Sequence, residues 1–200
     1  CSIGAAISDI TQGTAESVGQ IQKIIFQRRQ SVAGTDNTIP VASAALLASW
    51  TALIAAVDGT KVSVSDYIGE PTSTVGEVRE FGSGNAVKAG IPIVLGNDNS
   101  TFEAKFYEIS QATIAEMKAL RCETLQVYFV DECSTIWGVV DDVDTPTVHK
   151  GIDIFSLYVS DKQFGGYEAP DMNMIRFRMD ANWSDKLYPI IPTDFDKDDI

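Results

Sequence analysis

Alternation of apolar and polar residues with a period of two recurs along this 200-residue chain. In segment 101–107, Phe102, Ala104 and Phe106 alternate with more polar residues, and segment 173–179 alternates in the same way. Such alternation is typical of strands with one buried face, so it restricts the chain to folds built mainly from antiparallel sheet. Related patterns predict further strands at 20–27, 61–65, 93–95, 125–130, 135–140 and 153–160.

Apolar residues at three- and four-residue spacing predict two helices. The first covers 41–57 and ends in a left-handed turn at Gly59. The second covers 110–121, with Ser110 as its N-cap and basic residues in its last turn. Six to eight strands with two helices indicate an α+β fold, which is mainly an antiparallel β-sandwich or barrel flanked by one or two α-helices.

The chain divides by composition into an arm and a body. Residues 1–19 are small and polar and are predicted to form an N-terminal arm, whereas 20–200 form a single β domain. Within the domain, 66–92 is rich in glycine and carries scattered apolar residues, which predicts a long loop or an extended hairpin. This excursion is longer than ordinary connections of about 4–6 residues, so we expect it to become ordered on a neighbouring subunit.

The charge of the chain argues against a nucleic-acid binder. Acidic residues number 28 and basic residues 15, which gives a net charge of −13, whereas a protein that grips phosphates needs excess lysine and arginine. The longest apolar stretch, 41–57, is too short and too polar to span a bilayer. No basic segment precedes an apolar run near the start, so no signal peptide is expected, although Cys1 leaves a lipid-anchored binding module open.

The sequence contains no recognisable catalytic motif. Its single histidine, His149, lies in the polar segment 147–151 and is predicted to be a surface residue. The glycines at 82, 84 and 90 do not open a βαβ unit, so they indicate a turn and not a nucleotide site. Acidic clusters at 141–144 and 194–199 lack the glycine and glutamate of a calcium loop and indicate solvated turns. We therefore expect no enzyme activity and no catalytic, cofactor-binding or metal-binding residues.

Two of the cysteines flank a predicted strand. Cys122 and Cys133 lie on either side of 125–130, whose extended length would hold them apart. We therefore expect two buried free thiols and no disulfide between them. A zinc site is not expected either, because the sequence has one histidine and no CxxC motif.

Segment 101–138 resembles a known protein family in its order of elements. It reads TFEAKFYEI, then SQATIAEMKALRCE, then LQVYFVDECSTIWGV, which gives strand, helix, strand, turn and strand. This order is similar to the core of phage major tail tube proteins, a fold shared with inner tubes of contractile injection systems. The segments QIQKIIFQR and YPIIPTDFD and the excursion 66–92 are compatible with the same layout, so the resemblance covers most of 20–196.

The resemblance implies a structural virion protein. Copies of the chain would form rings of six, and the rings would stack with neighbouring tail proteins into a tube assembled in the host cytoplasm. DNA would pass through this tube without tight binding, because an acidic lumen repels phosphates. The same acidity is also explained by solubility alone. Other virion parts, namely a tail terminator, a connector ring or a head decoration protein, remain an alternative.

Overall fold

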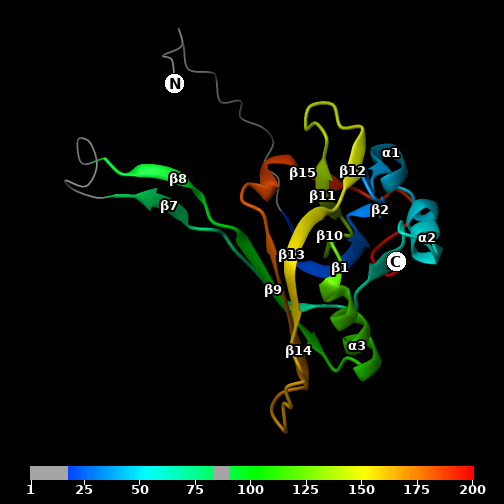
Figure 1. Cartoon of the computed structure of the whole chain (residues 1–200). Coiled ribbons are helices and arrows are strands. Elements are labelled where there is room, and N and C mark those ends of the chain that lie inside the picture. The colour runs from blue at the N-terminus through cyan, green and yellow to red at the C-terminus, as the bar shows by residue number, and fades with distance from the viewer. Residues whose placement is uncertain (1–17, 83–90) are drawn as a thin grey trace.

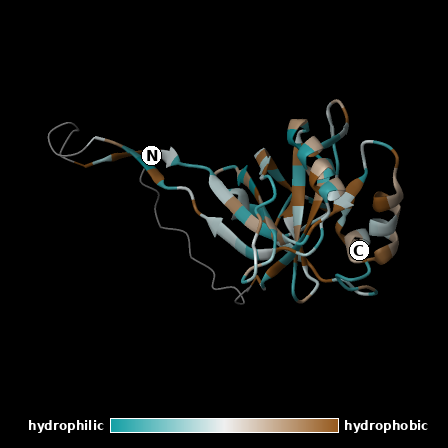
Figure 2. Cartoon of the chain, turned by 90° about the horizontal axis from the view of Figure 1, so that it is seen from below, coloured by the Kyte–Doolittle hydropathy of each residue, from teal (hydrophilic) through white to brown (hydrophobic). Residues whose placement is uncertain are grey.

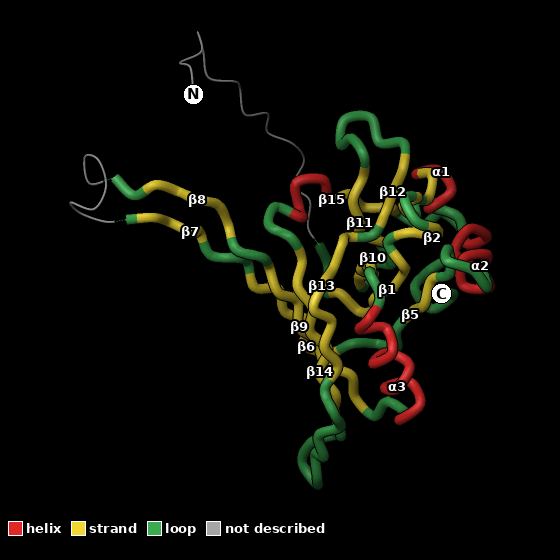
Figure 3. The backbone as a smooth tube through the Cα atoms, viewed as in Figure 1, coloured by secondary structure: helices red, strands yellow, loops and turns green. Residues whose placement is uncertain are grey.

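The computed structural model describes residues 18–82 and 91–200. Its helices are few and short, and most elements are antiparallel strands, as the sequence predicted for an α+β fold of the sandwich or barrel type (Figures 1 and 3). The helical elements are α1 (Val41–Ala44), α2 (Leu47–Ala55), α3 (Gln111–Ala119) and the 3-10 turns Leu120–Cys122 and Trp183–Lys186.

The strands form one large sheet and two small ones. In the large sheet the hydrogen-bonded order is β4-β12-β11-β10-β13-β14-β9-β6, while β1 joins β10 to β5 and β15 pairs with β11. The small sheets are the hairpins β2-β3 and β7-β8. The strand bounds are β1 (Ile21–Arg28), β2 (Gln30–Val32), β3 (Thr35–Asp36), β4 (Ile39–Pro40), β5 (Val62–Val64), β6 (Gly69–Thr74), β7 (Val78–Phe81), β8 (Ile93–Asn97), β9 (Ser100–Tyr107), β10 (Leu125–Asp131), β11 (Ile136–Val140), β12 (Val148–Lys150), β13 (Ile152–Val159), β14 (Met172–Met179) and β15 (Leu187–Ile190).

Strand β10 lies at the centre and is buried along its whole length. Its alternate side chains enter two apolar clusters on opposite faces. Val127 and Phe129 face the larger cluster with α3, whereas Tyr128 and Val130 face the smaller one with α1 and α2. Because both faces are covered, the stretch 127–130 is apolar without a break and does not alternate in hydropathy.

The large sheet curls so that strands that are not neighbours meet across the larger cluster. The rings of Phe102 in β9 and Phe129 in β10 lie 4.8 Å apart, although β13 and β14 separate these strands within the sheet. Phe102 also stacks on Phe177 of β14 at 5.0 Å. This closure buries the apolar residues that the sequence predicted to face inward in β9 and β14.

The helix predicted at 41–57 is wrong in its length and its end. Leu46 has an extended backbone (φ −112°, ψ 133°) and divides the segment into α1 and α2. The second piece ends at Ala55, and Gly59 is not left-handed. Instead, Gly59 passes so close to Ser31 that an added Cβ would lie 2.2 Å from the Ser31 carbonyl oxygen. By contrast, the predicted N-cap of α3 is confirmed, because the Ser110 hydroxyl accepts from the Thr113 amide.

Two side-chain predictions are also wrong. His149 is fully buried in β12, and not at the surface, because the period-two geometry of this short strand turns it inward against Tyr128. The thiols of Cys122 and Cys133 are free, as predicted, but exposed, because each lies in a turn beside β10 and not in the strand itself. The predicted N-terminal arm, apart from residues 18 and 19, and the tip of the excursion at 83–90 lie outside the described residues.

Candidate assembly surface

Within residues 18–82 and 91–200, the polar side chains do not form a recognisable catalytic or metal-binding group. No cluster of histidine, cysteine, aspartate and glutamate is suited to hold a metal ion in this part of the chain. None of the described helices is long and apolar enough to cross a membrane. The acidic segment 141–144 forms an exposed turn, in which Asp141 accepts hydrogen bonds from Thr147 and Val148, and these bonds lower the pKa of Asp141.

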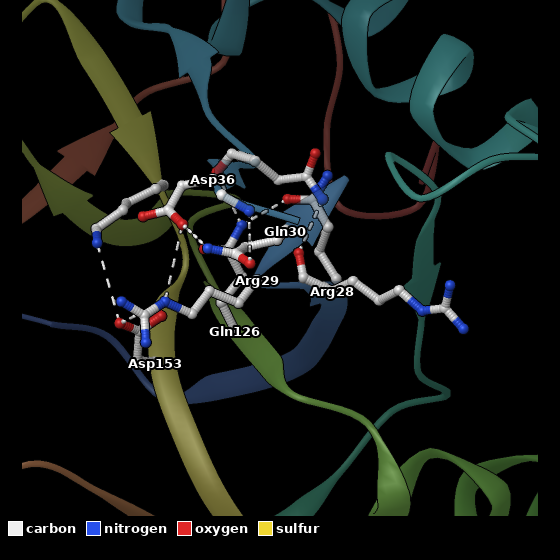
Figure 4. A network of polar contacts seen from close by, with 10 residues as sticks. Arg28, Arg29, Gln30, Asp36, Gln126 and Asp153 are labelled. Carbon is white, nitrogen blue, oxygen red and sulfur yellow. Dashed lines mark hydrogen bonds and ion pairs between the residues drawn. The ribbon is translucent and has the colours of Figure 1, made fainter. Parts of the chain in front are cut away.

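A network of polar contacts lies at the end of β1 (Figure 4). There the Arg29 guanidinium lies between Asp36 (3.9 Å) and Asp153 (3.6 Å), and Arg28 pairs with Glu123 at 2.8 Å. Each arginine therefore has a carboxylate partner, which leaves little positive charge to attract a phosphate. The cluster instead fastens the β2-β3 hairpin to the large sheet.

A buried amide network continues this cluster inward. The Gln126 amide donates to Gln27 Oε1 at 2.8 Å and to the Asn37 carbonyl at 3.1 Å. Gln27 in turn donates to the Thr60 carbonyl at 2.7 Å, and Asn37 donates to the Gly59 carbonyl at 2.7 Å. These bonds connect β1, β10 and the loop before β5, so they hold these elements together.

The β7-β8 hairpin is the prominent apolar feature of the described surface. It extends away from the body as an arm (Figure 1), and hydrophobic stretches lie along it (Figure 2). A two-stranded hairpin alone in water is only marginally stable. More than half of each apolar residue on the arm is nevertheless exposed, namely Val75, Val78, Phe81, Ile91, Ile93, Val94 and Leu95.

One face of the hairpin is more apolar than the other. Phe81 pairs directly with Ile93, so the two side chains lie on one face, whereas Leu95 is the extra residue of an irregularity between Val94 and Gly96. Glu80 pairs with Val94 on the opposite face. The strands thus present Phe81 and Ile93 side by side, and we call these two residues, with the exposed Leu95 beyond them, the hairpin face.

A second exposed apolar group lies in the loop between β13 and β14. Phe164 is 83% exposed, and Tyr167 is fully exposed. The loop beneath them is held by the Asp171 carboxylate, which accepts from the Gly165 amide at 3.1 Å, and by Lys162, which donates to the Ile109 carbonyl at 3.0 Å. We call residues 160–171 the aromatic loop. Sequence analysis missed it, although Phe164-Gly165-Gly166-Tyr167 combines turn-forming and aromatic residues in a recognisable way.

Comparison with known proteins gives distant similarities only. No family model matches the chain, and no curated protein matches it. Among solved structures, it is similar to a chain in the tail of an empty GTA particle refined with C6 symmetry. The two chains are 9% identical, the match covers 62% of this chain and 86% of that chain, and the TM-score is 0.33. It is also similar to a chain in the six-fold symmetrised baseplate of the anti-feeding prophage. The two chains are 10% identical, the match covers 90% of this chain and 98% of that chain, and the TM-score is 0.37. Similarity at this level establishes neither a shared family nor a shared function.

Proposed function

We propose that this protein is a structural subunit of a phage-type tail. Copies associate into rings, which we expect to have six members, and the rings stack into a tube that conducts DNA. The observation that supports this proposal best is the exposed hairpin face. Burying a side chain such as Phe81, Ile93 or Leu95 contributes about 1.5–3 kcal/mol, so contact with another copy would stabilise both the hairpin and the assembly.

The charge of the chain suits a conduit for DNA. With 28 acidic and 15 basic residues, the subunit repels a polyanion on average. In the described body, Arg28 and Arg29 are paired with carboxylates, so they do not form a basic patch that would hold DNA. A tube built from such subunits would let DNA slide without tight binding.

Electron microscopy with a matched pair of variants tests the proposal. We expect the wild-type protein to form tubes or stacked rings at high concentration, and Phe81→Asp with Ile93→Asp to abolish them, because charges would then enter the buried contact. The control is Val57→Asp, which places the same charge at a fully exposed apolar residue near the end of α2. Single closed rings would favour a terminator, connector or decoration protein, and a strict monomer at every concentration would refute self-assembly altogether.

A further inference from the structure

The aromatic loop has a fixed shape, although two of its rings are exposed. It projects beyond the ends of β13 and β14, at the bottom of Figure 1. Its base is closed by two main-chain hydrogen bonds between Gln163 and Met172, at 2.8 and 3.0 Å. Within the loop the main chain packs so tightly that a Cβ added at Gly165 would lie 1.9 Å from the Ala169 carbonyl oxygen. The subunit itself therefore holds Phe164 in place beside the body.

A wall of polar side chains faces the loop across an open cleft. The cleft has a volume of about 430 Å³, which suits a small ligand. Its wall consists of Glu70 from β6 and of Lys105 and Tyr107 from β9. The register of β6 shifts between Gly69 and Thr72, and Glu70 within this irregularity has a left-handed backbone with a φ of 50°. Such a backbone is costly for a residue other than glycine and is often found at functional sites.

Close packing and hydrogen bonds fix this wall. A Cβ added at Gly69 would lie 2.5 Å from the Tyr107 ring, so the glycine leaves room for that ring. The Glu70 carboxylate accepts from the Lys105 ammonium and from the Tyr107 hydroxyl, whose oxygen lies 2.6 Å away. The bond from Lys105, followed by that from Tyr107, lowers the pKa of Glu70, and the same carboxylate raises the pKa of Lys105. Both groups therefore stay ionised at neutral pH.

The groups around the cleft favour a neutral ligand that is rich in hydroxyl groups. Carboxylates from Glu70 and Glu168 disfavour an anion, and the Lys105 ammonium disfavours a cation. The ammonium has further N–H groups to donate, the carboxylates accept, and the Gln163 amide does both. A hydroxyl group also donates and accepts, so it can pair with each of them. The ring of Phe164, which is 83% exposed, offers a flat apolar surface next to these polar groups.

We propose that this cleft is a saccharide-binding site. The ring of Phe164 would lie against the less polar face of one sugar ring, while Glu70, Lys105 and Gln163 would form hydrogen bonds with its hydroxyl groups. The described residues of a single subunit supply all of these contacts. The site is therefore independent of the proposed tail assembly, and either proposal can fail alone.

Sugar binding to the full chain tests the proposal. Saturation-transfer NMR is recorded with glucose, galactose, mannose, N-acetylglucosamine and maltose, each at millimolar concentration. We expect at least one of these sugars to receive saturation from the protein, and Phe164→Ala to weaken its binding about five- to tenfold. The matched control is Phe81→Ala, which removes an exposed phenylalanine ring from the distant hairpin and should leave binding unchanged.

A second pair of variants tests the polar contacts. The side chain of Gln163 is exposed in the free cleft, so Gln163→Ala should leave the fold intact and weaken binding of the same sugar about three- to tenfold. Gln111→Ala, which removes an exposed glutamine at the start of α3, is the control and should have no effect. Circular dichroism would show that all variants are folded.

Three results would overturn the saccharide site. The first is that none of the five sugars binds, or that the bound sugar is held equally well by Phe164→Ala. The second is that tetramethylammonium binds in place of a sugar, which would show that Glu168 and the rings select a cation. The third is that Phe164→Ala abolishes self-association while no sugar binds, which would assign the loop to contact with a second copy. Failure of the wild-type chain to form rings or tubes would refute the proposed function and leave the sugar measurements unaffected.

Discussion

Trp137 donates its indole N–H to the buried carboxylate of Asp131, with a nitrogen–oxygen distance of 2.9 Å. The other carboxylate oxygen of Asp131 accepts from the amides of Cys133 and Thr135, each at 2.9 Å. One side chain thus closes the turn between β10 and β11 and orients the indole at the rim of the larger cluster. The carboxylate is buried, so its bonds to three donors offset the cost of removing it from water.

We expect Asp131→Ala to lower the free energy of unfolding by about 2–3 kcal/mol, because the Trp137 donor would remain buried without an acceptor. Urea denaturation followed by tryptophan fluorescence measures this loss. The control is Asp144→Ala, which removes a carboxylate from an exposed turn and should change stability by less than about 0.5 kcal/mol. Equal stability of the two variants would contradict the role assigned to Asp131.

His149 gives the protein a pH dependence of stability with a definite sign. Burial lowers the pKa of His149 from 6.5 to about 4, because the ring has little contact with water and Nδ1 has no hydrogen-bond partner. Between these values the unfolded chain binds a proton that the folded chain does not. Stability is therefore complete above about pH 6.5 and falls as the pH drops towards 4, by roughly 3 kcal/mol in total.

In the His149→Gln variant, the free energy of unfolding should no longer fall between pH 6.5 and 4. It should still fall at lower pH, because the carboxylates become protonated there. Denaturation midpoints across this range would show the difference between the two proteins. The histidine signals in an NMR titration are unambiguous, since the chain has a single histidine. An NMR titration midpoint near pH 6.5 for His149 in the folded protein would contradict the burial of its ring.

The sequence predicted the longer strands well, whether one face or both faces are buried. β9 and β14 each bury alternate residues, and β1 extends over nearly the segment predicted from QIQKIIFQ. The helix at 41–57 failed for a reason that no local pattern contains. The Asp194 carboxylate accepts from the Leu47 amide at 2.8 Å, and the Ala45 carbonyl accepts from the Thr193 amide, so contacts with the distant C-terminal segment stabilise the break between α1 and α2.

The candidate surface was only partly predictable. Glycines and scattered apolar residues identified the excursion at 66–92. However, β8, the partner of β7, lies beyond the end of that segment. Only the register of the two strands shows that Phe81 and Ile93 share a face. His149 was misplaced because the segment 147–151 is mostly polar. Its ring lies against Gly138 of the neighbouring strand β11, where the missing side chain leaves space, and this pairing cannot be read from the segment itself. Long-range pairing, and not residue type, decided both features.

The exposed thiols should be reactive in the native protein. We expect Ellman's reagent to modify Cys122 and Cys133 without denaturant, because both lie in solvent-accessible turns. A Cys1→Ser background removes the remaining cysteine, and peptide mapping assigns each modified site. Replacing either thiol by serine should change stability by less than about 0.5 kcal/mol. Modification that requires urea would show that the thiols are buried.

Lys23 fastens the last described residues to β1. Its buried ammonium donates to the main-chain oxygens of Lys197 and Ile200, at 2.6 and 2.8 Å, and lies 4.9 Å from the ring centre of Tyr67. We expect Lys23→Met to leave both oxygens without their donor and to lower stability by about 1–2 kcal/mol. Hydrogen exchange should accelerate at 196–200.

The control for Lys23 is Lys61→Met. Lys61 also donates to two main-chain carbonyls, those of Ile54 and Ala56, but it lies at the surface, where water replaces the lost donor. We therefore expect a smaller loss of stability and unchanged exchange at 196–200. Similar exchange in both variants would show that the C-terminal segment is held by other contacts.

Protection of the hairpin should depend on assembly. In the monomer, Arg79 is exposed on an arm that extends from the body, so trypsin should cleave rapidly after it. Once the hairpin face is covered by a second copy, cleavage at Arg79 should be strongly suppressed. Cleavage after Arg121, in the exposed 3-10 turn after α3, serves as the internal control and should proceed at similar rates in both forms. Equal cleavage at Arg79 in monomer and assembly would mean that the subunits associate through another surface. In that case, a variant whose hairpin is shortened to a tight turn would still assemble.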